Sequence, residues 1–315
     1  MFRSVTIVVL IAALTLAAAF TARSVWIKIK IATLTSPPST IFAPANAALP
    51  PKGARKRIVL IGDSRISRWP ETAWPENWEV INRGIGNETT AQLALRFQAD
   101  AIALDPDVIV IEAGINDLMA ASYMDEGAMH SVADKTVATL HRLASEAAGS
   151  GHRTLVATII PPARLGMLRW LVWKGELGGL VAQANTYLAK SAMPERAALI
   201  DFTSPLIADD RNQVSDEYRL DTLHFNAAGY QRLTAALIAH VQSVLNAGRP
   251  RPRLNISSMP AEDPARLRTR RHSLYRCGWI GRNRRPSRIN ALKGAWKGPR
   301  QSVGFDGLIR QWRLT

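Results

Sequence analysis

Four short polar segments contain the residue types of nucleophilic catalysis, and they follow one another in a fixed order. They are Gly62-Asp63-Ser64, Asn82-Arg83-Gly84-Ile85-Gly86-Asn87, Gly114-Ile115-Asn116-Asp117 and Asp221-Thr222-Leu223-His224. Together they contain a hydroxyl nucleophile, hydrogen-bond donors for an oxyanion, and a base with a carboxylate to orient it. This combination is typical of enzymes that transfer acyl groups through a serine.

Ser64 follows a short apolar run at residues 57–61. Consecutive β-branched and aliphatic residues are typical of a strand that is buried on both faces of a parallel sheet. Ligands of open α/β sheets bind beyond the carboxyl ends of the strands. We therefore expect the hydroxyl of Ser64 to be accessible to a substrate, although Gly-Asp-Ser after a strand is more often an ordinary turn.

Asp221 and His224 form the pair that would activate this hydroxyl. A serine needs a base within hydrogen-bond reach, usually a histidine whose second ring nitrogen is held by a carboxylate. A separation of three residues lets both side chains face one cleft. The alternative is that His224 only packs and that Asp221 is a loop residue or a helix cap. The other histidines lack such a neighbourhood and are interpreted as surface or packing residues: His130, His141, His152, His240 and His272.

An oxyanion site is expected at the same edge of the sheet. Asn116 follows a second buried-strand pattern at residues 107–111, so its amide would project beside Ser64. The backbone amides of Ser64 and of the glycine-rich turn at residues 84–87 would complete the site, since glycine lets a backbone approach a ligand closely. The alternative is a tight strand-to-helix turn with no such role.

Around these four segments, sequence patterns typical of strands alternate with patterns typical of helices. Strands are expected at 57–61, 79–82, 107–112, 153–160 and 198–201, and helices at 89–104, 127–149, 178–193 and 227–246. Such alternation predicts crossover units and a parallel sheet.

With these residues the chain resembles the SGNH hydrolase superfamily, the GDSL esterase and lipase family, over residues 55–247. The resemblance implies that Ser64 is the nucleophile, His224 the base, Asp221 its partner and Asn116 an oxyanion donor. It also implies an α/β fold: a three-layer α/β/α sandwich with a mostly parallel five-stranded sheet, similar to the flavodoxin-like arrangement. No metal or organic cofactor is expected.

Two positions depart from the family pattern. Arg65 stands where the name-giving motif has leucine, and Asn87 stands where the commonest form of the second segment has its oxyanion glycine. Asparagine tolerates left-handed conformations, so the amide of Asn87 can still donate. Alternatively, Gly86 takes the role after a shift of one residue.

The N-terminus carries an apolar stretch that ends near Ala22. Its length fits either a membrane span or a secretory signal, and an uncleaved anchor is favoured because Phe20 disfavours cleavage there. We therefore expect a signal or anchor at residues 1–30, a proline-rich linker at 31–54, and a protein that is membrane-anchored or secreted, outside the cytoplasm and periplasmic if bacterial.

The net charge of +15 suggests nucleic-acid binding, but the charge is unevenly distributed. Residues 249–315 contain 17 Lys and Arg against 3 Asp and Glu, a net of +14, whereas residues 1–248 contain 23 against 22, a net of +1. The basic tail, residues 248–315, is expected to be disordered. It would contact anionic lipid or nucleic acid, or have no selected function.

The sequence therefore predicts a serine hydrolase that cleaves carboxylic or thio esters of a small molecule. The apolar connection at residues 161–174 would line an acyl pocket, form a lid, or pack a short helix on the core. Two alternatives stay open: an acyltransferase that uses the same residues, and a non-catalytic binding module on the same fold.

Overall fold

A five-stranded sheet forms the centre of the protein. The computed structural model describes residues 2–35, 40–71, 74–164, 177–207 and 213–247. The strands are β1 (Lys56–Gly62), β2 (Trp78–Gly84), β3 (Val108–Glu112), β4 (Arg153–Ala157) and β5 (Ala197–Ile200). They pair in parallel in the order β2-β1-β3-β4-β5, as in flavodoxin-like folds, which confirms the expected architecture.

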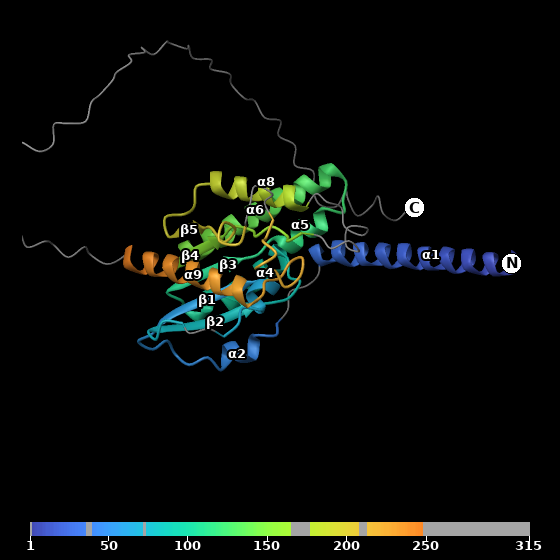
Figure 1. Cartoon of the computed structure of the whole chain (residues 1–315). Helices are drawn as coiled ribbons and strands as arrows, with labels where there is room; N and C mark the ends of the chain where they lie inside the picture. The colour runs from blue at the N-terminus through green and yellow to red at the C-terminus, as the bar shows by residue number, and fades with distance from the viewer. Residues whose placement is uncertain (1, 36–39, 72–73, 165–176, 208–212, 248–315) are drawn as a thin grey trace, which may run out of the picture. The chain divides into compact units, whose positions relative to one another are not determined.

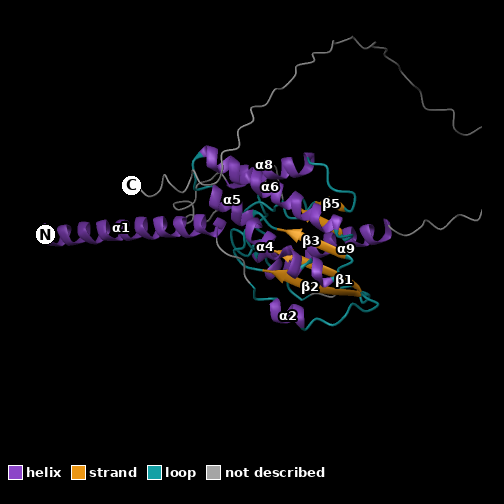
Figure 2. Ribbon diagram, turned by 180° about the vertical axis from the view of Figure 1, so that it is seen from behind, coloured by secondary structure: helices purple, strands orange, loops and turns teal. Residues whose placement is uncertain are grey.

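Helices cover both faces of this sheet (Figures 1 and 2). One face packs against α4 (Thr90–Asp100), α5 (Ile115–Ala121), α6 (Glu126–Gly149) and α8 (Leu177–Lys190). The other face packs against α3 (Ser64–Ser67) and α9 (Ala227–Ala247). The crossovers that connect parallel strands place these helices in layers, and the result is a three-layer sandwich.

The middle parts of the central strands β1 and β3 are apolar because each of their faces is covered. In β1, Val59 and Ile61 pack into the cluster that contains α4 and α6, whereas Ile58 and Leu60 pack into the cluster that contains α9. All four side chains are buried. Successive side chains of the strand therefore enter two different buried clusters in turn. Neither face of the strand is exposed to solvent.

Several boundaries differ from the sequence-based expectations. The helix expected at 89–104 ends at Asp100, and a separate 3-10 helix, Ile102–Leu104, follows it. Asp105 then turns the chain with a left-handed φ of 52°. The strand expected at 153–160 ends at Ala157, and the short helices α3 and α5 were not expected.

The N-terminal region forms a long helix, α1 (Phe2–Ala32), and a 3-10 turn, Thr33–Thr35. Within the expected linker lies a further short helix, α2 (Ala43–Ala47). The side chain of Asn46 donates to Asp100 on α4, so part of this region rests on the sheet's helical layer. Residues 165–174 of the connection that was expected to form a pocket or lid, and the basic tail at 248–315, lie outside the described residues.

Candidate active site

Ser64 is the first residue of α3, at the carboxyl end of β1. Asp63 caps this helix, since its carboxylate accepts a hydrogen bond from the amide of Arg65 at 2.9 Å. Gly62 allows the approach to β3, because a Cβ at this position would lie 1.9 Å from the backbone oxygen of Glu112. The strand end, the glycine and the cap together place a half-buried hydroxyl at the edge of the sheet.

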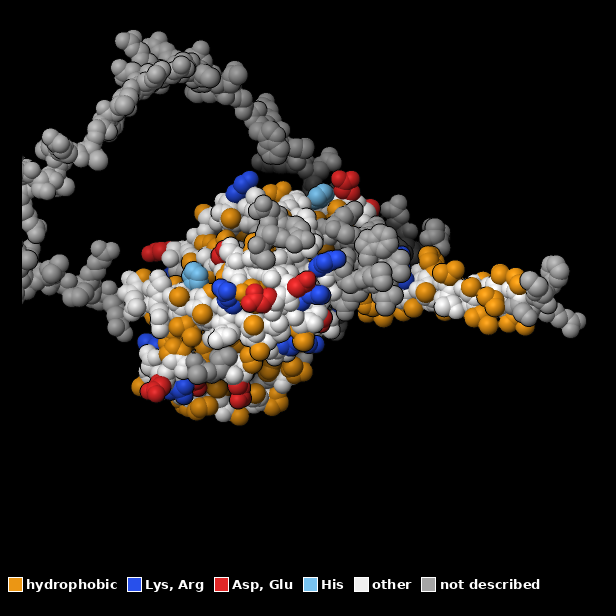
Figure 3. All heavy atoms as spheres, viewed as in Figure 1, with side chains coloured by type: hydrophobic (Ala, Val, Ile, Leu, Met, Phe, Trp, Pro, Cys, Tyr) orange, Lys and Arg blue, Asp and Glu red, His pale blue; other side chains and the backbone are white. Residues whose placement is uncertain are grey.

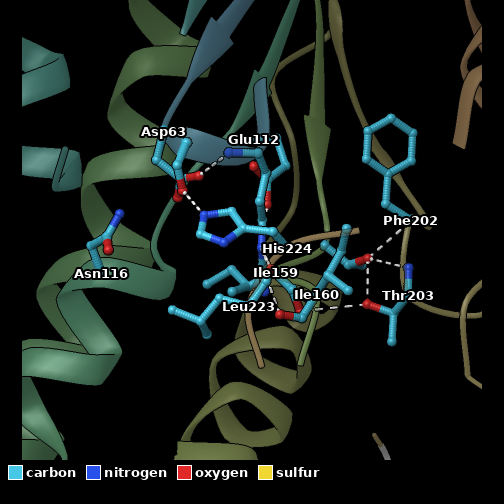
Figure 4. Close-up of polar contacts among 12 residues, drawn as sticks. Asp63, Glu112, Asn116, Ile159, Ile160, Phe202, Thr203, Leu223 and His224 are labelled. Carbon is cyan, nitrogen blue, oxygen red and sulfur yellow. Dashed lines mark hydrogen bonds and ion pairs between the residues drawn. The ribbon is translucent and has the colours of Figure 1, made fainter. Parts of the chain in front are cut away.

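His224 connects this hydroxyl to a carboxylate. Its Nε2 lies 2.9 Å from the Oγ of Ser64, and its Nδ1 lies 2.8 Å from Oδ2 of Asp221. Figure 4 shows the imidazole below the strand ends, with Asp63 and Glu112 on the strand side and Asn116 to one side. The structure thus brings the three sequence-predicted residues into one hydrogen-bonded chain, although Ser64 and His224 are 160 residues apart.

The environment of Asp221 keeps this carboxylate charged. Partial burial alone would raise its pKa, but hydrogen bonds from His224 and from the amides of Leu223 and His224 outweigh that effect and lower the pKa to about 2. A charged Asp221 requires the proton on Nδ1 of the imidazole. Nε2 is then left as an acceptor for the proton of Ser64.

The expected oxyanion donors lie beside this chain. Asn116 is buried on α5, and its Nδ2 donates to the backbone oxygen of Glu88 at 3.0 Å. Asn87 adopts the left-handed conformation, with a φ of 62°, in an exposed turn next to Gly86. Within the described residues the backbone amides of Ser64, Gly86 and Asn87 donate to no protein acceptor. These three N–H groups are therefore free for a ligand.

A buried carboxylate holds α5 and α4 together next to this site. Asp117 accepts from the amide of Thr90 at 2.9 Å and from its hydroxyl at 2.7 Å. Burial raises the pKa of Asp117 to about 6, although the hydrogen bonds from Thr90 lower it. Thr89, directly before, closes the N-terminus of α4 with a capping box to Gln92. The start of α4 and the start of α5 are thus fixed to each other, and Asn116 with them.

Arg65 is a structural residue of the site that sequence reasoning missed. Its guanidinium is buried, donates to the backbone oxygens of Leu223 at 3.0 Å and Ile160 at 2.8 Å, and lies 3.4 Å from the carboxylate of Glu112. The residue after Ser64 is therefore tied to the residue before His224. The only signal in the sequence was an arginine where the family has leucine.

Two buried carboxyls flank this arginine. Burial and, after it, the charge of Asp63 together raise the pKa of Glu112 to about 8, against the opposing effect of Arg65. Burial likewise raises the pKa of Asp63 to about 6, against the opposing effect of Arg65. One guanidinium does not compensate two buried negative charges, so the cluster favours holding a proton near neutral pH.

This cluster should make stability depend on pH. The pKa of Glu112 is higher in the folded than in the unfolded protein. Its contribution to the free energy of unfolding is therefore complete below about pH 4.5 and is lost as the pH rises to about 8. We expect Glu112→Gln to remove this loss. The melting temperature of the variant minus that of the wild type should increase by about 4 °C or more between pH 5 and pH 8.5, measured by differential scanning fluorimetry.

Glu195→Gln is the matched control, because Glu195 is exposed. Its melting curve should follow that of the wild type at every pH. Melting temperatures of Glu112→Gln that stay parallel to the wild type from pH 5 to 8.5 would show that Glu112 does not hold the proton.

Two of the remaining histidines contact backbone oxygens outside this chain. His141 contacts the backbone oxygen of Ala192 at 2.6 Å, and His152 contacts that of Pro106 at 3.0 Å, which fits their interpretation as packing residues. His272 lies outside the described residues.

Known proteins share both the sequence pattern and the fold. The model of the GDSL-like Lipase/Acylhydrolase family matches residues 60–232. A GDSL-like lipase from Bacteroides thetaiotaomicron has a similar structure, with a TM-score of 0.52, 24% identity and coverage of 65% of this chain and 96% of the other. A putative acylhydrolase from Bacteroides fragilis has a TM-score of 0.52, 26% identity and coverage of 66% and 96%. No curated protein matches the chain.

Proposed function

Because the chain belongs to the GDSL-like lipase/acylhydrolase family, we propose that it is a serine hydrolase that cleaves carboxylic or thio esters through an acyl-enzyme intermediate. The observation that carries this proposal is the hydrogen-bonded chain from Ser64 through His224 to Asp221. Its position at the carboxyl edge of the sheet also supports the proposal, since substrates of open α/β folds bind there.

In the first half-reaction the Oγ of Ser64 attacks the ester carbonyl while Nε2 of His224 accepts its proton. The tetrahedral intermediate collapses, the bond to the alcohol or thiol breaks, and His224 protonates this leaving group. In the second half-reaction His224 takes a proton from water, which attacks the acyl-serine and releases the acid. Ser64 recovers its proton from His224, and the cycle is complete.

Asp221 has the role of orienting the base. Because its carboxylate accepts from Nδ1, it holds the imidazole in the tautomer that the reaction needs and stabilises the imidazolium that forms. The two backbone amides that donate to its other oxygen keep the carboxylate itself in place.

We assign the oxyanion site to the amides of Ser64 and Asn87 and to the side chain of Asn116. The left-handed conformation of Asn87 supports this assignment, since it lets asparagine occupy the position of the family glycine. The amide of Gly86 is the alternative donor in the same turn. The two arrangements differ by one residue along the chain.

We further propose that α1 stays on the mature protein as a membrane anchor and that the hydrolase domain, residues 55–247, lies outside the cytoplasm. The most apolar 18-residue window of α1 has a mean hydropathy of 2.5 and is fully exposed. A signal sequence has the same composition, but Phe20 disfavours cleavage near Ala22, which supports retention.

The experiment that tests the hydrolase is a substrate series. The full-length chain in detergent is assayed with p-nitrophenyl esters from acetate to palmitate, and a fluorophosphonate adduct is located by mass spectrometry. We expect release of p-nitrophenol and an adduct on Ser64. Acyl transfer to an added alcohol in preference to water would indicate the acyltransferase. Absence of both turnover and adduct in a folded protein would leave the binding module.

A further inference from the structure

Helix α1 has two parts that differ in charge and in burial. Residues 5–22 carry no charge and are exposed on every face. At about 1.5 Å per residue they extend about 27 Å, close to the thickness of a bilayer's hydrocarbon core. Figure 3 shows the hydrophobic side chains that cover this part of the helix. The uncharged part of α1 is therefore long enough to span a membrane and is exposed along its whole length.

Partial burial begins at Arg23, the first charged residue after this stretch. Half-buried positions then recur every three or four residues, which is the spacing of one helix face. They are Arg23, Ser24, Trp26, Ile27, Lys30, Ile31, Thr33 and Leu34. We call residues 23–34 the docking segment. The protein thus begins to cover the helix where its membrane-compatible part ends.

The docking segment rests on the helix that carries Asn116. The indole of Trp26 meets the ring of Tyr123 edge to face, with centroids 5.2 Å apart and an interplanar angle of 88°. Tyr123 lies two residues beyond the end of α5, and Asn116 is the second residue of that helix. Trp26 also packs against the hydrophobic core cluster. The anchor is therefore attached at an element of the proposed oxyanion site.

A second contact reaches the turn on the other side of that site. The ammonium of Lys30 donates to the side-chain oxygen of Asn87 at 3.0 Å. The next residue, Glu88, accepts from Asn116 through its backbone oxygen. The docking segment thus contacts Asn87 directly, through Lys30. It is connected to Asn116 through the same turn, because Glu88, the neighbour of Asn87, accepts from the side chain of Asn116.

The rise of the helix sets the distance between the bilayer and the edge of the sheet that carries the candidate active site. Trp26 is four residues beyond Ala22 and Lys30 is eight, which correspond to about 6 Å and 12 Å along the helix. The headgroup layer on one side of a bilayer is about 5 to 8 Å thick. Tryptophan and lysine are also the residues that favour this layer. The catalytic edge would therefore lie at the level of the headgroups or just beyond them.

We infer that the docking segment holds the active-site edge against the bilayer, and that the substrate is the ester of an amphiphile seated in that same bilayer. The ester of such a molecule lies near the boundary between headgroups and acyl chains, close to the depth that the docking segment sets. Confinement of enzyme and substrate to one surface raises their effective concentration. This inference rests on the proposed hydrolase activity and on the retention of α1.

The test increases the distance between the membrane and the hydrolase domain. Seven helical residues, Ala-Glu-Ala-Ala-Lys-Ala-Ala, are inserted between Ala22 and Arg23; they add about 10 Å and nearly two full turns, so the docking segment keeps its facing direction. The same seven residues placed directly after Met1 are the matched control. Each full-length protein is reconstituted in phosphatidylcholine and phosphatidylglycerol vesicles. Hydrolysis is measured for p-nitrophenyl palmitate in the vesicles and for p-nitrophenyl acetate in the water.

The variant with the insertion between Ala22 and Arg23 should hydrolyse the vesicle ester at least about tenfold more slowly than the control and the soluble ester at an unchanged rate. Equal rates on the vesicle ester would overturn the inference, as would a wild type that cleaves only the soluble ester. So would a membrane-extracted protein whose intact mass lacks residues 1–22. A wild type that cleaves neither ester would instead refute the hydrolase activity itself.

Discussion

Replacing Ser64 with alanine is expected to lower kcat for ester hydrolysis by about 10⁴- to 10⁶-fold. The Oγ of Ser64 is the atom that would form the acyl bond, and its 2.9 Å contact with His224 would be the path of the proton. Alanine leaves the proposed oxyanion donors in place, so the variant should still bind substrate. Single-turnover and steady-state rates with p-nitrophenyl butyrate measure the loss.

Ser67→Ala is the matched control for this variant. Ser67 ends the same short helix, three residues later, and is exposed. It should keep the full kcat, and both variants should melt within a few degrees of the wild type. If Ser64→Ala kept more than about a hundredth of the activity in a folded protein, another nucleophile would have to be sought.

Replacing Asn116 with alanine is expected to lower kcat by about 10²- to 10³-fold with little change in KM, because an oxyanion donor acts mainly in the transition state. The side chain is buried, and its amide already donates one hydrogen to the backbone oxygen of Glu88. That contact fixes the direction of the second N–H, which would meet the oxyanion. Steady-state kinetics on a soluble ester separate kcat from KM.

Asn46→Ala distinguishes this effect from a general loss of structure. Asn46 on α2 also donates through its amide, to Asp100 and to the backbone of Ala99, but it belongs to the outer layer. It should lower the melting temperature without lowering kcat. A raised KM at constant kcat in Asn116→Ala would assign Asn116 to ground-state binding and remove it from the oxyanion site.

The strands could be predicted from the sequence because both faces of the sheet are covered. Residues 58–61 and 108–111 are apolar runs that only a buried parallel strand explains easily. Helix α5 was missed for a related reason. All of its residues are buried, so it shows no polar face, and Gly114 begins it without a side-chain cap. A short helix without periodicity leaves no pattern to detect.

Some residues of the candidate site could be predicted from the sequence and others could not. Ser64, Asp221 and His224 could be singled out because their chemistry is specific and Asp221 and His224 are close in sequence. The supports of the site could not be predicted. Arg65 reaches Leu223 across 158 residues, and Lys30 reaches Asn87 across 57. Such pairs depend on how distant segments meet, which local spacing does not contain.

The distance along the chain between Ser64 and His224 has a consequence for biosynthesis. A ribosome that adds about 5 to 20 residues per second completes the intervening 160 residues in roughly 8 to 32 s. For nearly all of that interval Ser64 has been made but Asp221 and His224 have not. A chain that is interrupted before residue 221 would therefore carry the proposed nucleophile without its proposed base. Under the proposed mechanism, such unfinished copies would not hydrolyse esters.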